Sequence, residues 1–222
     1  MGRWLRRALA SSIGKKSAMA VSGLLLIGFL IVHLSGNLLI FADQQGHAFD
    51  EYARKLDDNP LLPVAEIALL ALFVVHIALA LRVSNENRDA RRIGYGVRSS
   101  MGAKTIASST MIVTGSIVLI FLIVHLADFR IGKMFSDASP FSLAAMVRRR
   151  LHEPLGAAIY LAGVAALGVH LRHAFRSAFQ TLGVNHPKLN PILVYVGWAL
   201  AVILAAGFAA FPIAMLARGG AA

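Results

Sequence analysis

The stretch Gly28-Phe29-Leu30-Ile31-Val32-His33-Leu34-Ser35-Gly36-Asn37-Leu38-Leu39-Ile40 places one ionisable imidazole inside an apolar run long enough to cross a bilayer. Apart from His33, no side chain in this stretch can carry a charge. Such a residue is costly in lipid, so it needs a polar partner, a water-filled cavity or a ligand. The same pattern recurs in three later apolar segments, at His76, His125 and His170. This recurrence is the strongest functional signal in the sequence.

The composition indicates a membrane protein. Of the 222 residues, 57% are hydrophobic and only 15% are charged. Several apolar runs approach the roughly 20 residues that span a hydrocarbon core, and the short alternating segments of a β-barrel do not occur. We therefore predict an all-α membrane protein, a single domain over residues 1–222, with five transmembrane helices at about 17–40, 62–82, 105–129, 154–175 and 191–216.

The net charge of +11 raises the question of nucleic-acid binding. The basic residues lie between the apolar spans, however, where membrane topology explains them better than a nucleic-acid partner does. The chain has no cysteine, which excludes disulfides, thiolate-bound iron–sulphur clusters and cysteine nucleophiles within it.

The distribution of Lys and Arg predicts the orientation, because cytoplasmic segments are enriched in both. Residues 1–16, 82–104 and 172–190 hold 14 of the 22 Lys and Arg residues. We therefore expect the N-terminus inside and the C-terminus outside, in the inner (cytoplasmic) membrane of the cell. A signal peptide is the alternative for the first span, but its apolar part is about twice the usual length. An interfacial helix is expected around 141–147.

Span direction sorts the four histidines into pairs. The first and third spans run outward and reach His33 and His125 late, whereas the second and fourth run inward and reach His76 and His170 near their inner ends. The two levels should lie roughly 10–15 Å apart at the helical rise per residue. Two stacked bis-histidine sites are what two haems b require.

The alternatives for these histidines are weaker. A single histidine in one span would more readily be a hydrogen-bonded or interfacial residue than a ligand. Four, one in each span and matched in depth, favour haem ligation. A zinc site is disfavoured because histidines and carboxylates do not cluster at one level and cysteine is absent.

An offset of ten residues connects the two levels. Gly23 and Gly115 precede His33 and His125 by ten residues, so they should lie at the inner level and leave space for a porphyrin, or serve ordinary helix packing. The same offset from His76 and His170 leads to Glu66 and Tyr160 at the outer level. Glu66 is a candidate for a hydrogen bond to a ligating histidine or for proton transfer to a quinone near the outer haem, with an interfacial carboxylate as the alternative.

Basic residues near the inner level are candidates for binding haem propionates, although the sequence favours anchoring at the inner membrane surface as the role of the lysine and arginines. His173 also competes with His170 as a ligand, but its place beside arginines at the interface suits a propionate better. These candidates are Lys16, Arg82, Arg172, His173 and Arg176.

Motifs around the four histidines resemble those of a known family. They are His33-Leu34-Ser35-Gly36-Asn37-Leu38, His76 followed by Leu81-Arg82, Val124-His125-Leu126, and His170-Leu171-Arg172-His173 followed by Ser177-Ala178-Phe179-Gln180-Thr181-Leu182-Gly183. In this order they resemble the dihaem cytochrome b membrane anchor of succinate dehydrogenases and fumarate reductases, of the five-helix single-chain type. The similarity runs from about residue 17 to the end of the fifth span.

The resemblance implies a subunit of a succinate:quinone oxidoreductase of the tricarboxylic acid cycle, with two haems b as cofactors. It implies an iron–sulphur subunit docked on the inner face, which carries a flavoprotein subunit where succinate and fumarate react. Electrons then pass between that chemistry and menaquinone or another quinone in the lipid. The direction of catalysis and a higher oligomer of the complex stay open. One branch of the family has a proton-transferring glutamate two residues before the last haem histidine, where this chain has Gly168.

Two other functions fit parts of the pattern. A dihaem cytochrome b of a hydrogenase or formate dehydrogenase would share the chemistry and differ in its soluble partners. A transporter using intramembrane histidines for ions or protons would favour broken helices or inverted repeats.

Overall fold

The computed structural model describes residues 11–89, 106–138 and 140–217. This part of the chain contains helices and no strand. Five helices contain stretches long and apolar enough to cross a membrane: α2 (Ser12–Asn37), α4 (Leu62–Asp89), α5 (Ile106–His125), α8 (Pro154–Thr181) and α9 (Leu189–Ala217). The prediction of an all-α protein with five spans is confirmed. Much of the predicted basic segments 1–16 and 82–104 lies outside the described residues.

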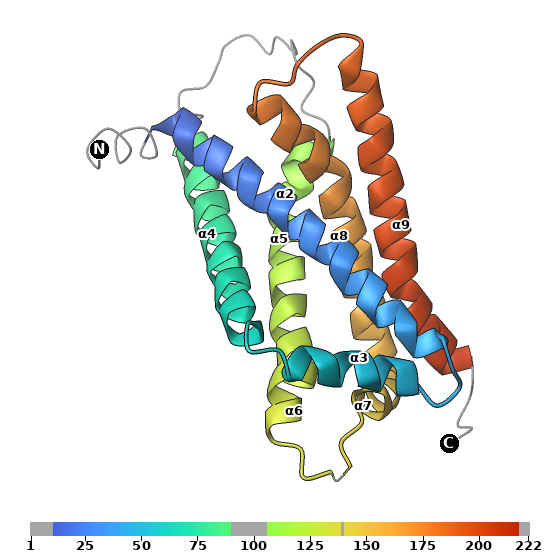
Figure 1. The fold of residues 1–222 in the computed structure, drawn as a ribbon. Coiled ribbons are helices and arrows are strands. Elements are labelled where there is room, and N and C mark those ends of the chain that lie inside the picture. Colours follow the sequence, from blue (N-terminus) through green and yellow to red (C-terminus); the bar gives the residue numbers. More distant parts are fainter. Residues whose placement is uncertain (1–10, 90–105, 139, 218–222) are drawn as a thin grey trace.

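Shorter helical segments gather at one end of the bundle (Figure 1). They are the 3-10 helix η1 (Leu38–Phe41), α3 (His47–Asp57), the π-helix η2 (Leu126–Ile131), α6 (Gly132–Met134) and α7 (Leu143–His152). Helix α7 is the predicted interfacial helix, whereas α3, inside the polar link, was not predicted. The third span continues beyond α5 through η2 and α6 to Met134. Helix α2 starts at the end of the bundle opposite to the one where α9 finishes (Figure 1).

Four spans form an open ring. Helix α2 packs against α4 and α8, and α8 packs in turn against α5, but α4 and α5 make little contact in the described chain. Helix α9 covers the outside of this group, mainly along α8. None of the most apolar stretch of α4 is buried, and only 6% of that of α5 is. The two helices that close the ring are therefore the least covered by protein.

Glycines allow helix α8 to approach its neighbours closely, as small residues do in membrane bundles. Gly163 faces the ring of Phe121 on α5. A Cβ at Gly168 would lie 3.0 Å from the Cβ of Ala205 on α9. There is no room at Gly168 for a glutamate side chain without separating α8 from α9.

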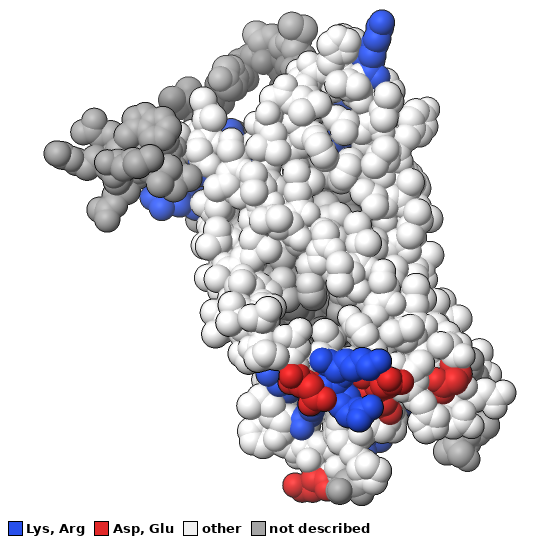
Figure 2. Space-filling view, in the orientation of Figure 1, with Lys and Arg blue, Asp and Glu red and all other residues white. Residues whose placement is uncertain are grey.

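The charged side chains avoid the middle of the molecule. On the face shown in Figure 2 they concentrate around α3, α6 and α7 and leave an uncharged band above. Large apolar side chains such as Ile67, Val74, Ile123 and Ile203 are exposed on the spans. An uncharged band with exposed aliphatic side chains is what contact with lipid requires.

Helix α3 is held at its start by a carboxylate. Asp43 accepts hydrogen bonds from the backbone amides of Gly46, His47 (2.9 Å) and Ala48 (2.9 Å). Gly46 adopts φ +83°, a left-handed conformation that suits glycine. The hydrogen bond from Ala48, supported by those from His47 and Gly46, lowers the pKa of the Asp43 carboxyl. This carboxylate therefore caps the helix in its ionised form.

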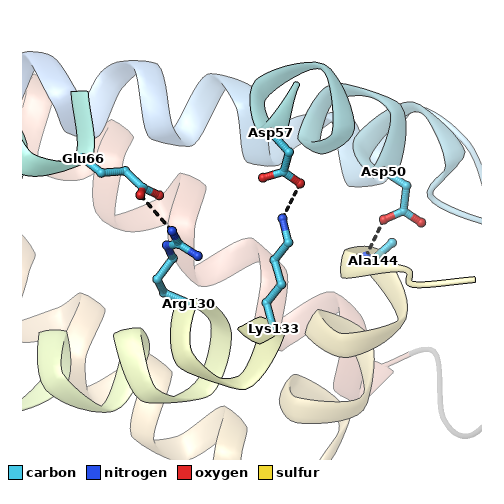
Figure 3. A network of polar contacts seen from close by, with 6 residues as sticks. All are labelled: Asp50, Asp57, Glu66, Arg130, Lys133 and Ala144. Carbon is cyan, nitrogen blue, oxygen red and sulfur yellow. Dashed lines mark hydrogen bonds and ion pairs between the residues drawn. The ribbon is translucent and has the colours of Figure 1, made fainter. Parts of the chain in front are cut away.

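Helix α3 is tied to the start of α7 by a second carboxylate. Asp50 accepts hydrogen bonds from the backbone amide of Ala144 at 2.8 Å and from the hydroxyl of Ser142 at 2.6 Å (Figure 3). Ser142 also caps α7 by accepting from the amide of Ala145 at 3.0 Å. One pair of side chains thus fixes the position of both interfacial helices.

Replacement of the capping carboxylate should loosen the start of α3. In Asp43→Ala the amides of His47 and Ala48 lose their acceptor, so we expect them to exchange hydrogen faster, as measured by hydrogen–deuterium exchange mass spectrometry. Because the pKa of Asp43 is lowered in the folded state, its stabilisation is complete above the unfolded pKa of about 3.9 and disappears as the pH falls through the lower folded value. Asp58→Asn, at the other end of α3, is the control and should leave the exchange of the His47 and Ala48 amides unchanged. Equal exchange of these amides in both variants would contradict the capping role of Asp43.

Candidate functional site

Two of the predicted histidines meet between helices α2 and α5. The ring centroids of His33 and His125 lie 5.8 Å apart, with the ring planes perpendicular at 90°. Aromatic rings surround both imidazoles: Phe29 lies 5.3 Å from His33, and Phe129 lies 5.3 Å from His125. Since α2 and α5 do not otherwise pack closely in the described chain, the two histidines are their main point of approach. We call this the outer level.

The other two histidines lie against the opposite helices at the inner level. The Nδ1 atom of His76 on α4 is 3.0 Å from the hydroxyl of Ser22 on α2, and the Nδ1 atom of His170 on α8 is 3.3 Å from the hydroxyl of Thr114 on α5. The His76 and His170 imidazoles are close enough to interact electrostatically. The structure thus brings His33 and His125 together and places His76 and His170 near each other on opposite helices.

Glycines face both inner histidines. A Cβ built on Gly23 would lie 3.1 Å from Cε1 of His76, and one built on Gly115 would lie 3.3 Å from Cε1 of His170. Ten residues of helix, about 15 Å, separate each glycine from the outer histidine on its own helix. Tyr160, ten residues before His170, lies at the outer level with its ring 6.0 Å from that of His125. Gly23, Gly115 and Tyr160 therefore lie at the levels that the ten-residue offsets predict.

Each histidine pair joins helices that are diagonal in the four-helix ring. The ring runs α4, α2, α8, α5, and the pairs connect α2 with α5 and α4 with α8. Side chains that meet across a diagonal occupy the centre of a bundle, where cofactors of helical bundles are held. The described histidines and carboxylates form no group of three or more that could hold a metal ion.

The outer histidines have the spacing that a bis-histidine haem would need. Two imidazoles on one iron place their ring centroids roughly 6 Å apart, given metal–nitrogen bonds of about 2 Å. The outer pair has that separation. Nδ1 of His125 is buried without a hydrogen-bond partner among the described residues, so this imidazole is not satisfied by protein alone. At the inner level, the imidazoles of His76 and His170 lie directly against Gly23 and Gly115, where a side chain would displace them.

An additional polar cluster adjoins the outer level. Asp128, one turn after His125 in the π-helix η2, accepts hydrogen bonds from Nε of Arg150 at 2.8 Å and from the hydroxyl of Tyr160 at 3.0 Å. The Asp128 carboxylate raises the pKa of the Arg150 guanidinium. π-Helical turns are frequent at functional sites. Sequence reasoning missed Asp128, although it is the first acidic residue after His125 in the same span.

Glu66 does not contact a histidine. Its carboxylate accepts a hydrogen bond from Arg130 at 2.8 Å, beside the ion pair of Lys133 with Asp57 (Figure 3). The Glu66 and Arg130 side chains are 38% and 49% exposed, so the pair contributes little to stability. The pair leaves Glu66 accessible at the outer end of the spans.

The basic candidates lie at the inner end in different settings. Lys16, Arg82, Arg172 and Arg176 are exposed and His173 is half-buried. Arg82 lies 3.7 Å from Glu86, and the Arg172 guanidinium lies over the ring of Trp198 at 4.4 Å. The neighbouring Lys15, which sequence reasoning missed, is buried and paired with Glu86. Adjacent lysines on a helix point in different directions, and a basic run alone does not tell which one faces the bundle.

Comparison with known proteins was made at three levels. Models of protein families, curated proteins and solved structures gave no match to this chain. The function proposed below is therefore supported by the residues of this chain and by the motifs described above.

Removal of the Asp128 carboxylate should destabilise the outer end of the bundle. In Asp128→Ala, Arg150 and Tyr160 lose a charged partner in a partly buried position, which costs about 2 kcal/mol. We expect a lower thermal unfolding midpoint in detergent, followed by intrinsic fluorescence, than in the exposed control Asp137→Ala. Equal midpoints for the two variants would show that the Asp128 cluster does not stabilise the fold.

Proposed function

We propose that this chain is the membrane-anchor cytochrome b subunit of a succinate dehydrogenase or fumarate reductase. In this proposal His33 and His125 hold the outer of two haems b, and His76 and His170 hold the inner one. When bound, the haems supply one-electron carriers between an iron–sulphur subunit and a membrane quinone, menaquinone or another. The chain is then the electron-transfer and quinone-reactive subunit of the enzyme, while succinate and fumarate react in other subunits.

The observation that carries the proposal is the meeting of four histidines, one from each of four spans, in diagonal pairs at two levels. The meeting of two histidines at a single level could reflect simple packing of polar groups away from lipid. Recurrence at a second level, with glycines opposite the imidazoles, supports a function that needs two sites of the same kind. The described spans also stay helical through the levels of their histidines, which does not favour a transporter with broken helices.

The protein around the sites supplies a dry environment and a route for protons. Phe29, Phe129 and Phe208 surround the outer imidazoles and exclude water from them. Quinone chemistry takes up or releases protons, and the carboxylates nearest to the outer level are Asp128 and Glu66. In the proposal Glu66 exchanges protons between a quinone near the outer haem and water.

The proposal includes an orientation and partners. The N-terminus faces the cytoplasm and the C-terminus lies outside, in the inner membrane of the cell. The iron–sulphur subunit docks on the inner face and carries the flavoprotein. A dihaem cytochrome b of a hydrogenase or formate dehydrogenase would hold its haems in the same way, so the subunits that copurify with the chain distinguish the two.

Replacement of single histidines tests the ligand pairs. We expect His76→Ala and His170→Ala to lose the same haem, the inner one, and His33→Ala and His125→Ala to lose the other, because each haem would be held by both imidazoles of its pair. Reduced-minus-oxidised optical spectra and haem content per chain of the purified protein measure this. His186→Ala, in the loop before α9, is the control. If both haems survive each replacement, or if the losses combine the histidines differently, the assignment is wrong.

Filling the space opposite an inner histidine should affect one level alone. Gly23→Leu places a branched side chain where a Cβ already lies 3.1 Å from His76, so we expect it to remove the inner haem. Gly28→Leu on the same helix is the matched control, because nothing lies within 4 Å of a Cβ at Gly28. Equal haem content in the two variants would contradict a cofactor at the inner level.

A further inference from the structure

Two spans carry the same short pattern before their outer histidine. Val21-Ser22-Gly23 precedes His33-Leu34, and Val113-Thr114-Gly115 precedes His125-Leu126, with the same spacing. In both cases a hydroxyl residue stands eleven residues before the histidine and a glycine ten residues before it. The sequence alone predicts a role for the glycines, whereas the contacts of the two hydroxyls are seen only in the structure.

Each hydroxyl contacts Nδ1 of an inner histidine that comes from another helix. Ser22 lies 3.0 Å from Nδ1 of His76, and Thr114 lies 3.3 Å from Nδ1 of His170. The Ser22 and Thr114 side chains are buried, with 4% and 9% of their surface exposed. The two contacts are therefore shielded from competing water.

The direction of these hydrogen bonds follows from the single proton of a hydroxyl. Ser22 donates its proton to the carbonyl of Met19 at 2.9 Å, and Thr114 donates to the carbonyls of Thr110 (3.0 Å) and Met111 (3.2 Å). With the hydroxyl protons on these carbonyls, the hydroxyl oxygens are left as acceptors, and Nδ1 of each histidine donates to them. A neutral imidazole with a proton on Nδ1 has its lone pair on Nε2.

We propose that Ser22 and Thr114 are positioning residues that hold His76 and His170 in the tautomer with Nε2 free to bind iron. This inference rests on the proposed function and deepens it, since it names the groups that prepare both ligands of one haem. A hydrogen bond from Nδ1 to an acceptor makes the imidazole a stronger donor to the metal. Its effect on the iron is a lower midpoint potential and tighter binding.

The outer histidines lack this arrangement. Nε2 of His33 lies 3.2 Å from the side-chain amide of Asn37, and Nδ1 of His125 has no partner among the described residues. The hydroxyls therefore act on one pair only. In the proposal, therefore, only the inner haem has both of its histidines held by a serine or threonine hydroxyl.

Serine and threonine in helices often bond only to their own backbone, and the chain offers matched controls for that role. Ser35 and Ser116 each donate to the carbonyl four residues earlier, at 2.8 Å, and both are exposed. They lie on the same two helices as Ser22 and Thr114. Ser35→Ala and Ser116→Ala therefore remove a hydroxyl that bonds only to the backbone of its own helix.

The experiment is a redox titration of the two haems in the purified protein, combined with electron paramagnetic resonance of the oxidised form. We expect Ser22→Ala and Thr114→Val each to raise the midpoint potential of the same haem, to change its low-spin signal, and to lower its affinity by on the order of 10–100-fold. The conservative variants Ser22→Thr and Thr114→Ser should keep the wild-type potential and signal. Ser35→Ala and Ser116→Ala should leave both haems unchanged.

Two outcomes overturn the inference while leaving the proposed function intact: both haems keep wild-type potentials and signals in Ser22→Ala and Thr114→Val, or the two variants alter different haems. A purified protein without haem overturns the proposed function instead. The tautomer is read directly from ¹⁵N chemical shifts of labelled histidines in protein from which the haems have been removed, because iron on Nε2 would keep the proton on Nδ1 in every variant. Protonated Nδ1 in His76 and His170, lost in Ser22→Ala and Thr114→Val, supports the positioning role; protonated Nε2 in the wild type overturns it.

Discussion

An imidazole inside an apolar bundle has to be satisfied by something other than water, and this constraint organises the molecule. Four of the spans carry such a side chain, and each of these histidines is half-buried among neighbouring helices. The meeting of the rings of His33 and His125 at 5.8 Å, between helices that hardly pack otherwise, follows from this requirement. Aliphatic side chains such as Leu34, Leu167 and Leu204 fill the core around these histidines, and others are exposed on the outside of the spans.

Small residues make this arrangement possible. Without a hydrophobic force between helices in lipid, spans associate through close packing, and glycines determine where they can approach. Gly163 and Gly168 allow α8 to pack closely against α5 and α9. Gly23 and Gly115 instead face the imidazoles of the inner histidines. The least covered spans, α4 and α5, are also the ones on either side of the opening in the ring. Helix α8 is thus closely packed on two sides, whereas α4 and α5 make little contact with each other in the described chain.

The number of spans, their approximate limits and the grouping of histidines by depth could be predicted because they depend on hydropathy, helical rise and alternating direction. Other features depend on which side chains face each other across helices, and a linear sequence does not contain that information directly. Ser22 and Thr114 look like ordinary helix residues until His76 and His170 are placed beside them. Lys15 differs from Lys16 only in its rotation about α2. Helix α3 forms in a polar link because Asp43 and Asp50 provide its cap and its anchor.

The most direct test of the whole account is the amount of haem b bound to each chain in protein purified from its native membrane, measured by the pyridine haemochrome assay against quantitative amino-acid analysis. Two bis-histidine sites predict two haems b per chain. A colourless protein, or one with a single haem b per chain, would contradict the account, because two diagonal histidine pairs at two levels would then have no common purpose.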